Sequence, residues 1–245
     1  MRICTWNIQL GLRLHLVLEA IRAQPDFRTL DFLALQEASV HKGREDAAFI
    51  AEALGPEYQY FQATAQMLRG RDQGNAIIWR RGAFEPSVPQ VVALTGLGPS
   101  QMRRAERTLL RAIPPQRRIA IRAESAAMRV YVIHLDVLGF THKLEQFRAV
   151  ISDMSARPRV PLTLVAGDLN TFGPPRLLMW RRIRAAARSA GLIELTTSIR
   201  RTHWTAQKLD AIYANAGTNL KHRSWVIKVR ASDHMPVFVE LETEQ

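Results

Sequence analysis

Apolar and polar positions along the chain follow two periods in alternation, one typical of strands and one typical of helices. Short apolar runs bounded by polar or turn residues predict buried strands, whereas apolar residues spaced three and four apart predict helices. The predicted strands cover residues 2–9, 32–36, 58–63, 75–80, 118–123, 129–135, 161–166, 209–214, 225–229 and 236–241. The predicted helices cover residues 12–23, 44–54, 143–156 and 177–190, and residues 70–74 are predicted to form a turn.

This alternation predicts an α/β fold. The strands are numerous enough for a sandwich of two sheets, and the intervening helices can cover the outer faces. No linker rich in Pro, Gly or Ser divides the pattern, so residues 1–245 are predicted to form a single domain.

Polar residues able to do chemistry stand at the ends of the predicted strands, where active sites are usually assembled. They are Asn7, Glu37, His134, Asp136, Asp168, Asn170, Asp210, Asp233 and His234.

Composition narrows the class of protein. No stretch approaches the roughly 18 uninterrupted apolar residues of a membrane span, and the first residues lack the apolar block of a signal peptide. A cytoplasmic location is therefore the default expectation. The single cysteine, Cys4, excludes an intramolecular disulfide framework and a cysteine-rich zinc site, and it is expected to pack as a small hydrophobic residue.

The chain carries a formal net charge of +12. Such a field attracts polyanions, so nucleic acid or an anionic lipid surface is a plausible partner. Only five of the 34 basic residues are lysines, however, and general arginine enrichment would give the same excess without any selected partner.

The segment after the predicted strand 161–166 offers the first candidate chemistry. Asp168 and Asn170 are two residues apart, so they project from the same side if the chain remains extended. A carboxylate beside an amide can orient and deprotonate water while holding a phosphate oxygen. The alternative is an Asx turn that caps the next segment, because Asp and Asn favour turns for their own reasons.

Two further clusters are weak when each is taken alone. His234 could donate to a phosphoryl oxygen if Asp210 fixed its tautomer, although a loop cap with an exposed histidine is the simpler interpretation of Ser232-Asp233-His234. Glu37 ends a predicted buried strand and suffices as the principal protein ligand of a hard cation such as Mg²⁺. No zinc-ligand spacing, phosphate-binding glycine loop or Gly-x-Ser-x-Gly elbow is present.

Taken together and in order, these clusters resemble a known signature series, that of the endonuclease/exonuclease/phosphatase superfamily, the deoxyribonuclease I-like group. The matching segments are Thr5-Trp6-Asn7-Ile8, Leu35-Gln36-Glu37, Ile133-His134-Leu135, Gly167-Asp168-Leu169-Asn170, Leu209-Asp210 and Ser232-Asp233-His234. The resemblance spans residues 5–234 and implies a four-layer α/β/β/α sandwich, in which helices cover two packed mixed β-sheets.

The resemblance also implies a Mg²⁺-dependent hydrolase, with Mn²⁺ as an alternative ion, in which water displaces one ester oxygen of a phosphate. The implied metal-site residues are Asn7, Glu37 and Asp233. The implied catalytic residues are His134, Asp168, Asn170, Asp210 and His234. In this scheme Asp168 orients or activates water and Asn170 helps to hold it. The two histidines donate to phosphate oxygens, and Asp210 orients His234.

Two departures from the family pattern are visible. Trp79-Arg80-Arg81 stands where the family has "LSR", and the family's phosphate-contacting tyrosine has no clear counterpart. Tyr131 lies within a predicted strand and is as consistent with the core as with a site. Asp136 is interpreted as structural and is left out of the set that contacts substrate.

The substrate is less well determined, because this superfamily holds nucleases, RNA deadenylases, inositol polyphosphate phosphatases, sphingomyelinases and tyrosyl-DNA phosphodiesterases. Two basic segments, residues 101–123 and 176–201, could hold a long polyanion, and Trp180 and Trp204 could stack on unpaired bases. The alternatives are that the first segment is a solvated loop and that Trp180 makes an apolar contact on an amphipathic helix.

The leading hypothesis is a DNA or RNA endo- or exonuclease. The second is a phosphatase or phosphodiesterase acting on a lipid or small soluble ester. The third is a catalytically inactive polyanion-binding module, against which the intact set of acids and histidines argues.

Overall fold

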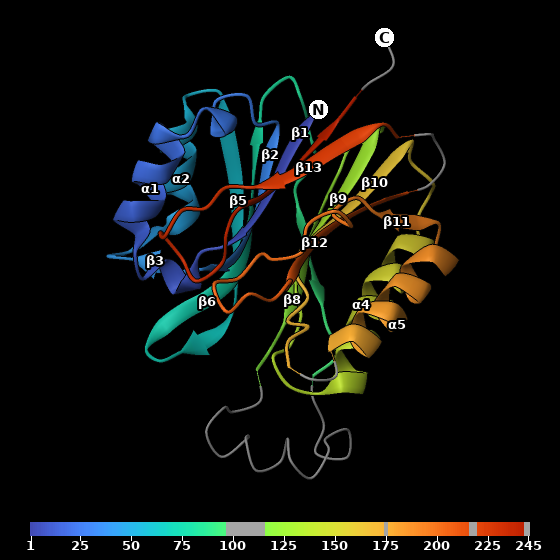
Figure 1. Cartoon of the computed structure of the whole chain (residues 1–245). Coiled ribbons are helices and arrows are strands. Elements are labelled where there is room, and N and C mark those ends of the chain that lie inside the picture. The colour runs from blue at the N-terminus through green and yellow to red at the C-terminus, as the bar shows by residue number, and fades with distance from the viewer. Residues whose placement is uncertain (97–115, 174–175, 216–219, 243–245) are drawn as a thin grey trace.

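Two six-stranded β-sheets stacked face to face form the centre of the structure (Figure 1). The computed structural model describes residues 1–96, 116–173, 176–215 and 220–242. The first sheet has the order β13 (His222–Val226), β14 (Val237–Leu241), β1 (Arg2–Asn7), β2 (Phe32–Ala38), β6 (Arg71–Arg80) and β5 (Tyr58–Leu68). The second has the order β11 (Leu192–Glu194), β12 (Asp210–Asn215), β10 (Leu162–Asp168), β9 (Met128–His134), β8 (Ile119–Glu124) and β7 (Gln90–Ala93).

Helices cover the outer face of each sheet (Figure 1). The first sheet is covered by α1 (Leu14–Ala23) and α2 (Asp46–Leu54), and the second by α4 (Phe140–Ser155) and α5 (Arg176–Ser189). The connections include two short 3-10 helices, η1 (Gln9–Gly11) and η2 (Pro25–Phe27), and a hairpin of β3 (Val40–His41) and β4 (Arg44–Glu45). The predicted four-layer α/β/β/α sandwich is therefore confirmed.

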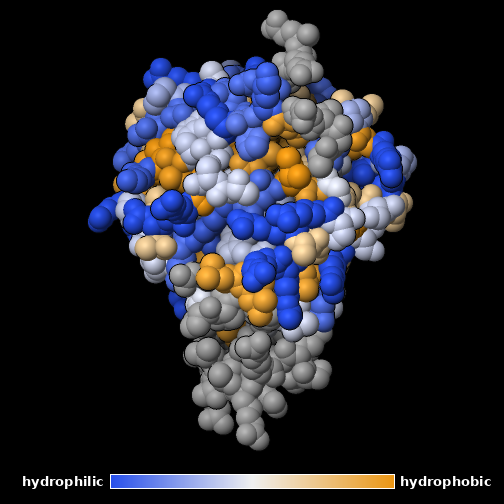
Figure 2. Space-filling view, turned by 45° about the vertical axis from the view of Figure 1, so that its right-hand side comes forward, coloured by the Kyte–Doolittle hydropathy of each residue, from blue (hydrophilic) through white to orange (hydrophobic). Residues whose placement is uncertain are grey.

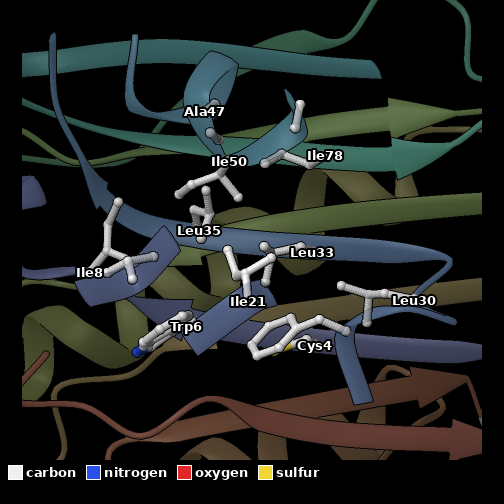
Figure 3. Packing of buried hydrophobic residues seen from close by; sticks show 14 of the residues in the cluster. Cys4, Trp6, Ile8, Ile21, Leu30, Leu33, Leu35, Ala47, Ile50 and Ile78 are labelled. Carbon is white, nitrogen blue, oxygen red and sulfur yellow. The ribbon is translucent and has the colours of Figure 1, made fainter. Parts of the chain in front are cut away.

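Three apolar layers hold the four structural layers together. Trp6 and Leu33 point toward α1 and α2, where they pack with Ile21 and Ile50 (Figure 3). Successive residues of a strand face opposite sides, so Phe32, which precedes Leu33, packs instead between the two sheets. A third cluster fills the space between the second sheet and the helices α4 and α5.

The cysteine behaves as the sequence predicts. Cys4 has no exposed surface and belongs to the cluster under α1 and α2 (Figure 3). Burial raises the pKa of its thiol well above the ordinary value, which favours the uncharged thiol. A reactive thiolate is therefore disfavoured at this position.

The structure differs from the predicted elements at strand ends and sheet edges. The predicted turn over residues 70–74 is wrong: Arg69 and Gly70 alone turn the chain, both with positive φ, and β6 begins at Arg71. The strand predicted at 225–229 ends at Val226, where its partner Val237 begins β14. The edge strands β7 and β11 and the β3–β4 hairpin were not predicted, because they are too short or too exposed to leave an apolar run.

Strand direction places the functional ends together. β1 and β2 are parallel, as are β9 and β10, so the carboxyl ends of each pair lie at one edge of its sheet. β12 and β14 run antiparallel to these strands, and therefore start at the same edges. Contacts between β1 and β10 bring the two sheets together face to face. Four strand ends and two strand starts thus meet at one rim of the sandwich.

Exposed large hydrophobic side chains are scattered over different elements. Met67 lies in β5, Val88 precedes β7, and Leu177 lies in α5, with 62%, 75% and 69% of their surfaces exposed. Figure 2 likewise shows hydrophobic residues in separate patches among hydrophilic ones on the face that it presents. Isolated exposed apolar residues are ordinary on protein surfaces and indicate no docking face by themselves. None of the helices described is long and apolar enough to cross a bilayer.

Candidate active site

The parallel pair β1 and β2 presents an amide and a carboxylate at the rim. Asn7 is the last residue of β1, and its side chain is 3% exposed. Glu37 lies at an irregularity between Gln36 and Ala38, where its φ of 55° breaks the regular pleat. Such bulges redirect a side chain, which explains why a residue inside a buried strand reaches the rim. The amide of Gln73, on β6, donates to Oε1 of Glu37 at 3.2 Å.

The second parallel pair places a histidine beside a carboxylate. His134 and Asp168 are register partners at the ends of β9 and β10. This close pairing needs Gly167, since a Cβ there would lie 1.9 Å from the carbonyl oxygen of Ile133. The backbone N–H of Asn170 donates to Oδ1 of Asp168 at 2.8 Å. Both interpretations made from the sequence therefore hold in part: the segment is a tight turn, and it also faces the site.

The amide of Asn170 does not point into the centre of the cluster. Its Nδ2 donates to the backbone carbonyl of Leu135 at 2.8 Å, and the side chain is buried. This bond joins the loop after β10 to the loop after β9. Asn170 therefore braces Asp168 in this structure, and a direct contact with substrate stays a prediction.

A buried ion pair stands at the start of β12. Nδ1 of His234 lies 2.9 Å from Oδ2 of Asp210, and neither side chain is more than 6% exposed. The hydroxyl of Thr202 accepts hydrogen bonds from the backbone N–H groups of Leu209 and Asp210. On the other side, the indole of Trp6 donates to the carbonyl of His234 at 3.0 Å. The pair is thus held from both sheets.

These groups converge on one oxygen atom. Oδ2 of Asp168 accepts a hydrogen bond from Nδ2 of Asn7 at 3.0 Å. Nε2 of His134 lies 3.6 Å from the same oxygen, and Nε2 of His234 lies 3.7 Å from it. Oε1 of Glu37 is 3.8 Å from Nε2 of His134. Residues as far apart in the sequence as 7 and 234 therefore surround a single small space.

Burial and mutual charge shift the titration of these groups. Burial raises the pKa of Asp168 to about 6, although His234 acts in the opposite direction. Burial also raises the pKa of Glu37, with Arg118 and His234 opposing. Burial alone would lower the pKa of His234, but Asp210 and Asp168 raise it to about 10. His234 is therefore an imidazolium at neutral pH, whereas Asp168, with a pKa of about 6, is mostly ionised there and can still take up a proton.

One known protein family matches this chain over nearly its whole length. The family model described as "Endonuclease/Exonuclease/phosphatase family" matches residues 4–234. The chain belongs to this family. It is a family of hydrolases that act on phosphate esters and use divalent metal ions, so the resemblance identified from the motifs is confirmed. No curated protein sequence matches the chain.

Solved structures share the fold at low sequence identity. A family protein from Leptotrichia buccalis C-1013-b superimposes with a TM-score of 0.71 at 17% identity, covering 99% of this chain and 100% of that one. The human Nocturnin catalytic domain gives 0.68 at 17% identity, covering 99% and 93%. A mannosyl-6-phosphatase from Bacteroides thetaiotaomicron VPI-5482 gives 0.67 at 15% identity, covering 99% and 100%. At such identities the likeness establishes the fold alone.

Asp233 lies at the outer margin of the cluster rather than at its centre. Its Oδ2 accepts from the amide of Gln9 at 3.0 Å and lies 3.7 Å from Nε2 of His203. Its Oδ1 accepts from the hydroxyl of Ser232 at 3.1 Å. Its ligand oxygen and the imidazole nitrogens of His203 and His234 all lie within 4.8 Å of one another. The structure therefore associates Asp233 with His203, which sequence reasoning did not select.

The central residues suit a divalent cation. Asp168 is buried and the side chain of Glu37 is 19% exposed, and burial raises the pKa of both carboxyl groups, so a cation bound beside them would favour their charged forms. Oδ1 of Asp210 is buried without a hydrogen-bond partner among the residues described and is a further oxygen donor. Carboxylate and amide oxygens are the donors that hard cations prefer. Glu37, Asn7 and Asp168 thus offer the chemistry of a magnesium or manganese site.

A second residue beside the cluster, an arginine, was also not selected from the sequence. Arg118, directly before β8, is buried and places Nη1 2.9 Å from Nδ1 of His134. A guanidinium only donates hydrogen bonds, so Nδ1 must accept and Nε2 must carry the proton. Burial and the nearby Arg118 lower the pKa of His134 well below its ordinary value, which keeps the ring neutral. The available signal was the position of Arg118 at the start of a predicted strand.

Other residues singled out in the sequence lie outside the cluster. Tyr131 is buried and donates to Asp153, so it belongs to the core. Trp180, a residue of α5, is 6% exposed and packs in the apolar cluster between α5 and the second sheet, which contradicts stacking on an unpaired base. Trp204 is partly exposed. The backbone N–H of Asp136 donates to the side chain of Gln146, consistent with a structural role.

Only parts of the two basic segments lie among the residues described, and binding of a polyanion along them stays a prediction. Residues 101–115 of the first segment lie outside the described residues, and Arg122 is paired with Asp153. In the second segment, Arg184 is paired with Glu194. A cavity of about 630 Å³ between α4 and α5 is lined by helix residues, none of which belongs to the acidic and histidine cluster.

Proposed function

We propose that this chain is a divalent-metal-dependent phosphodiesterase that hydrolyses nucleic acid with water, using Mg²⁺ or Mn²⁺. The observation that carries the proposal is the convergence of Asn7, His134 and His234 on Oδ2 of Asp168. A buried carboxylate with donors on the same side is suited to a reaction in which water loses a proton while a neighbouring oxyanion gains charge.

Asp168 is the base in this scheme. Its pKa of about 6 keeps it ionised at neutral pH yet able to accept a proton from water. The water oxygen bonds to phosphorus, the bond from phosphorus to the leaving oxygen breaks, and the water proton passes to Asp168. The N–H of Asn170 and the amide of Asn7 hold one oxygen each of the carboxylate, so its orientation is set before substrate arrives.

The two histidines stabilise the phosphoryl oxygens by different means. His234 is cationic because of Asp210, so its Nε2–H donates with full positive charge. His134 is neutral and donates through Nε2–H because Arg118 occupies Nδ1. A divalent ion held by Glu37 and Asn7 would supply further positive charge to the phosphoryl oxygens. Asp233 would tune this region through His203 and His234.

Nucleic acid is proposed as the substrate on the basis of charge. The net charge of +12 raises the local concentration of a polyanion and speeds its encounter with the protein. A small soluble or lipid phosphate ester would gain less from such a field, because it carries fewer charges. Those esters are the alternative that the experiment must separate.

A substrate panel tests the proposal. Single- and double-stranded DNA and RNA oligonucleotides, bis-p-nitrophenyl phosphate, p-nitrophenyl phosphate and a phosphoinositide are incubated with EDTA, Mg²⁺ or Mn²⁺. We expect cleavage of nucleic acid with either cation and none with EDTA. Asp168→Asn is expected to reduce kcat about a thousandfold, whereas Asp72→Asn, a carboxylate outside the cluster, leaves it unchanged.

Two outcomes would contradict the proposal in different ways. Turnover of the phosphoinositide or p-nitrophenyl phosphate with nucleic acid untouched would reject the substrate and retain the chemistry. Equal activity of the wild type and Asp168→Asn on every substrate would reject the chemistry itself.

A further inference from the structure

A cavity of about 390 Å³ lies next to the catalytic cluster. It is lined by Arg13, Trp204, Arg230, Ser232 and Asp233. Ser232 and Asp233 immediately precede His234, so the cavity and the proposed catalytic centre share one wall. A substrate whose phosphate lies at His234 can therefore extend into this cavity.

Two arginines line this cavity, and a third, Arg201, lies against its tryptophan. Nη1 of Arg13 donates to the backbone carbonyl of Arg230 at 3.0 Å, which brings both side chains to the same wall. The guanidinium groups of Arg201 and Arg230 lie 5.9 and 5.1 Å from the ring centroid of Trp204. Over the described ranges, no carboxylate forms a salt bridge with any of the three. Their charge is therefore available to a ligand.

The tryptophan makes this wall rigid. Its Nε1–H donates to the carbonyl of Ser232 at 3.2 Å, and its backbone N–H donates to the carbonyl of Asp233. The indole thus supports the guanidinium groups through cation–π contact rather than turning freely. A rigid support lowers the entropy lost when the arginines bind an anion.

One acidic residue also stands in the cavity wall. Both carboxylate oxygens of Asp233 accept hydrogen bonds, one from Ser232 and one from Gln9, and its side chain is 37% exposed. Arg13 and Arg230 outnumber this single carboxylate, so the residues that line the cavity carry a net positive charge.

We infer that this cavity is a subsite for the neighbouring backbone phosphate of a nucleic-acid strand whose scissile phosphate lies at Asp168 and His234. The inference rests on the proposed function, because it assumes that the substrate carries a second phosphate one nucleotide from the first. Contacts to backbone phosphates position the strand in the site, but they do not distinguish one base from another. The subsite therefore favours a chain of nucleotides over a compact ester with one phosphate.

Binding measured without turnover tests the subsite. Fluorescence anisotropy of labelled single-stranded oligonucleotides is recorded in EDTA for the wild type and for Arg13→Gln/Arg230→Gln. We expect roughly tenfold weaker binding, alike for two unrelated base sequences. The slope of log K against log salt should fall by roughly 0.7, the value for one phosphate contact on a single strand.

The matched control is Arg22→Gln/Arg28→Gln. It removes the same number of positive charges from two exposed positions, Arg22 in the last turn of α1 and Arg28 directly after η2. A loss of affinity in the control equal to that in the cavity variant would overturn the inference, because the general field and not a subsite would then account for binding. Unchanged affinity and salt slope in the cavity variant would overturn it as well.

Kinetics separate this inference from the proposed function. The cavity variant is expected to lose at least about ten times more kcat/KM on an oligonucleotide than on bis-p-nitrophenyl phosphate, which has a single phosphate. Equal losses on both substrates would overturn the subsite and leave the hydrolase intact. If the wild type cleaves neither substrate, the proposed function fails, and the anisotropy measurement still decides whether the cavity binds the strand.

Discussion

Replacing Arg118 by methionine removes the group that determines the protonation pattern of His134. In the wild type, Nη1 of Arg118 occupies Nδ1 of His134 at 2.9 Å, so the proton resides on Nε2, the atom that faces Glu37 and Asp168. Methionine fills a similar volume but donates nothing. Nδ1 then lacks its donor, and either ring nitrogen can carry the proton.

The expected loss of kcat follows from the free energy of the hydrogen bond between the charged Arg118 and the neutral His134. A hydrogen bond to a charged group contributes about 1.5–3 kcal/mol, and each 1.4 kcal/mol or so changes a rate tenfold. If the bond acts in the transition state by holding Nε2–H toward the phosphate, kcat should fall roughly tenfold to 150-fold. Arg118→Lys keeps the charge and one donor, so it should recover part of this loss.

Two measurements check this prediction. The first is kcat on bis-p-nitrophenyl phosphate. The second is the ¹⁵N spectrum of His134 in EDTA, which reports the tautomer without any turnover. We expect a single Nε2–H tautomer in the wild type and a mixture in Arg118→Met. Arg122→Met is the matched control, since Arg122 is a buried arginine of the same segment that pairs with Asp153, away from the site.

Each variant loses a buried arginine, which affects the stability of the fold. The melting temperature of each variant shows whether a lower kcat reflects loss of folded protein or loss of catalysis. The reasoning is refuted if Arg118→Met retains the Nε2–H tautomer and a kcat within about twofold of the wild type. It is also refuted if Arg122→Met lowers kcat as much as Arg118→Met does.

Three further predictions concern stability. Burial raises the pKa of Asp46 from 3.8 to about 6, so the folded state binds a proton at this carboxyl group more tightly than the unfolded state does. The free energy of unfolding should therefore fall by about 3 kcal/mol as the pH rises from about 4 to about 6. Urea denaturation should show a smaller decrease in the free energy of unfolding over this pH range in Asp46→Asn than in the wild type. An identical pH dependence in the wild type and in Asp46→Asn would contradict the prediction. Gly167→Ala would place a Cβ 1.9 Å from the oxygen of Ile133 and should cost more than about 3 kcal/mol. Gly96→Ala, whose Cβ meets nothing within 4 Å, should change stability by less than about 1 kcal/mol, and equal effects would reject this contrast. Phe27→Ala should lower the free energy of unfolding by about 3–5 kcal/mol, because the ring packs on Trp6 and Phe238, and a loss below about 1 kcal/mol would contradict that estimate.

Much of the fold could be predicted because its central strands are buried on both sides. β1, β2, β9 and β10 consist of apolar runs that end in polar residues, and such runs are visible without any knowledge of their partners. Edge strands such as β7 lack that signal, since one side faces solvent. Placing the polar residues at strand ends selected Asn7, His134 and His234, which meet around Asp168, but it also selected Asp136 and Asp233, which do not.

The sequence by itself determined the periods of the elements, the order of the motifs and thereby the family. Each of these depends on residues close together along the chain. Only the tertiary structure decided that Arg118 sets the tautomer of His134, that Asp233 lies with His203, and that Arg13 meets Arg230 beside the site. Residues 13 and 230 are brought together by strand order, because β1 and β14, which are far apart along the chain, are neighbours in the first sheet. No local preference encodes such contacts, because their free energy arises only when the whole sandwich has formed.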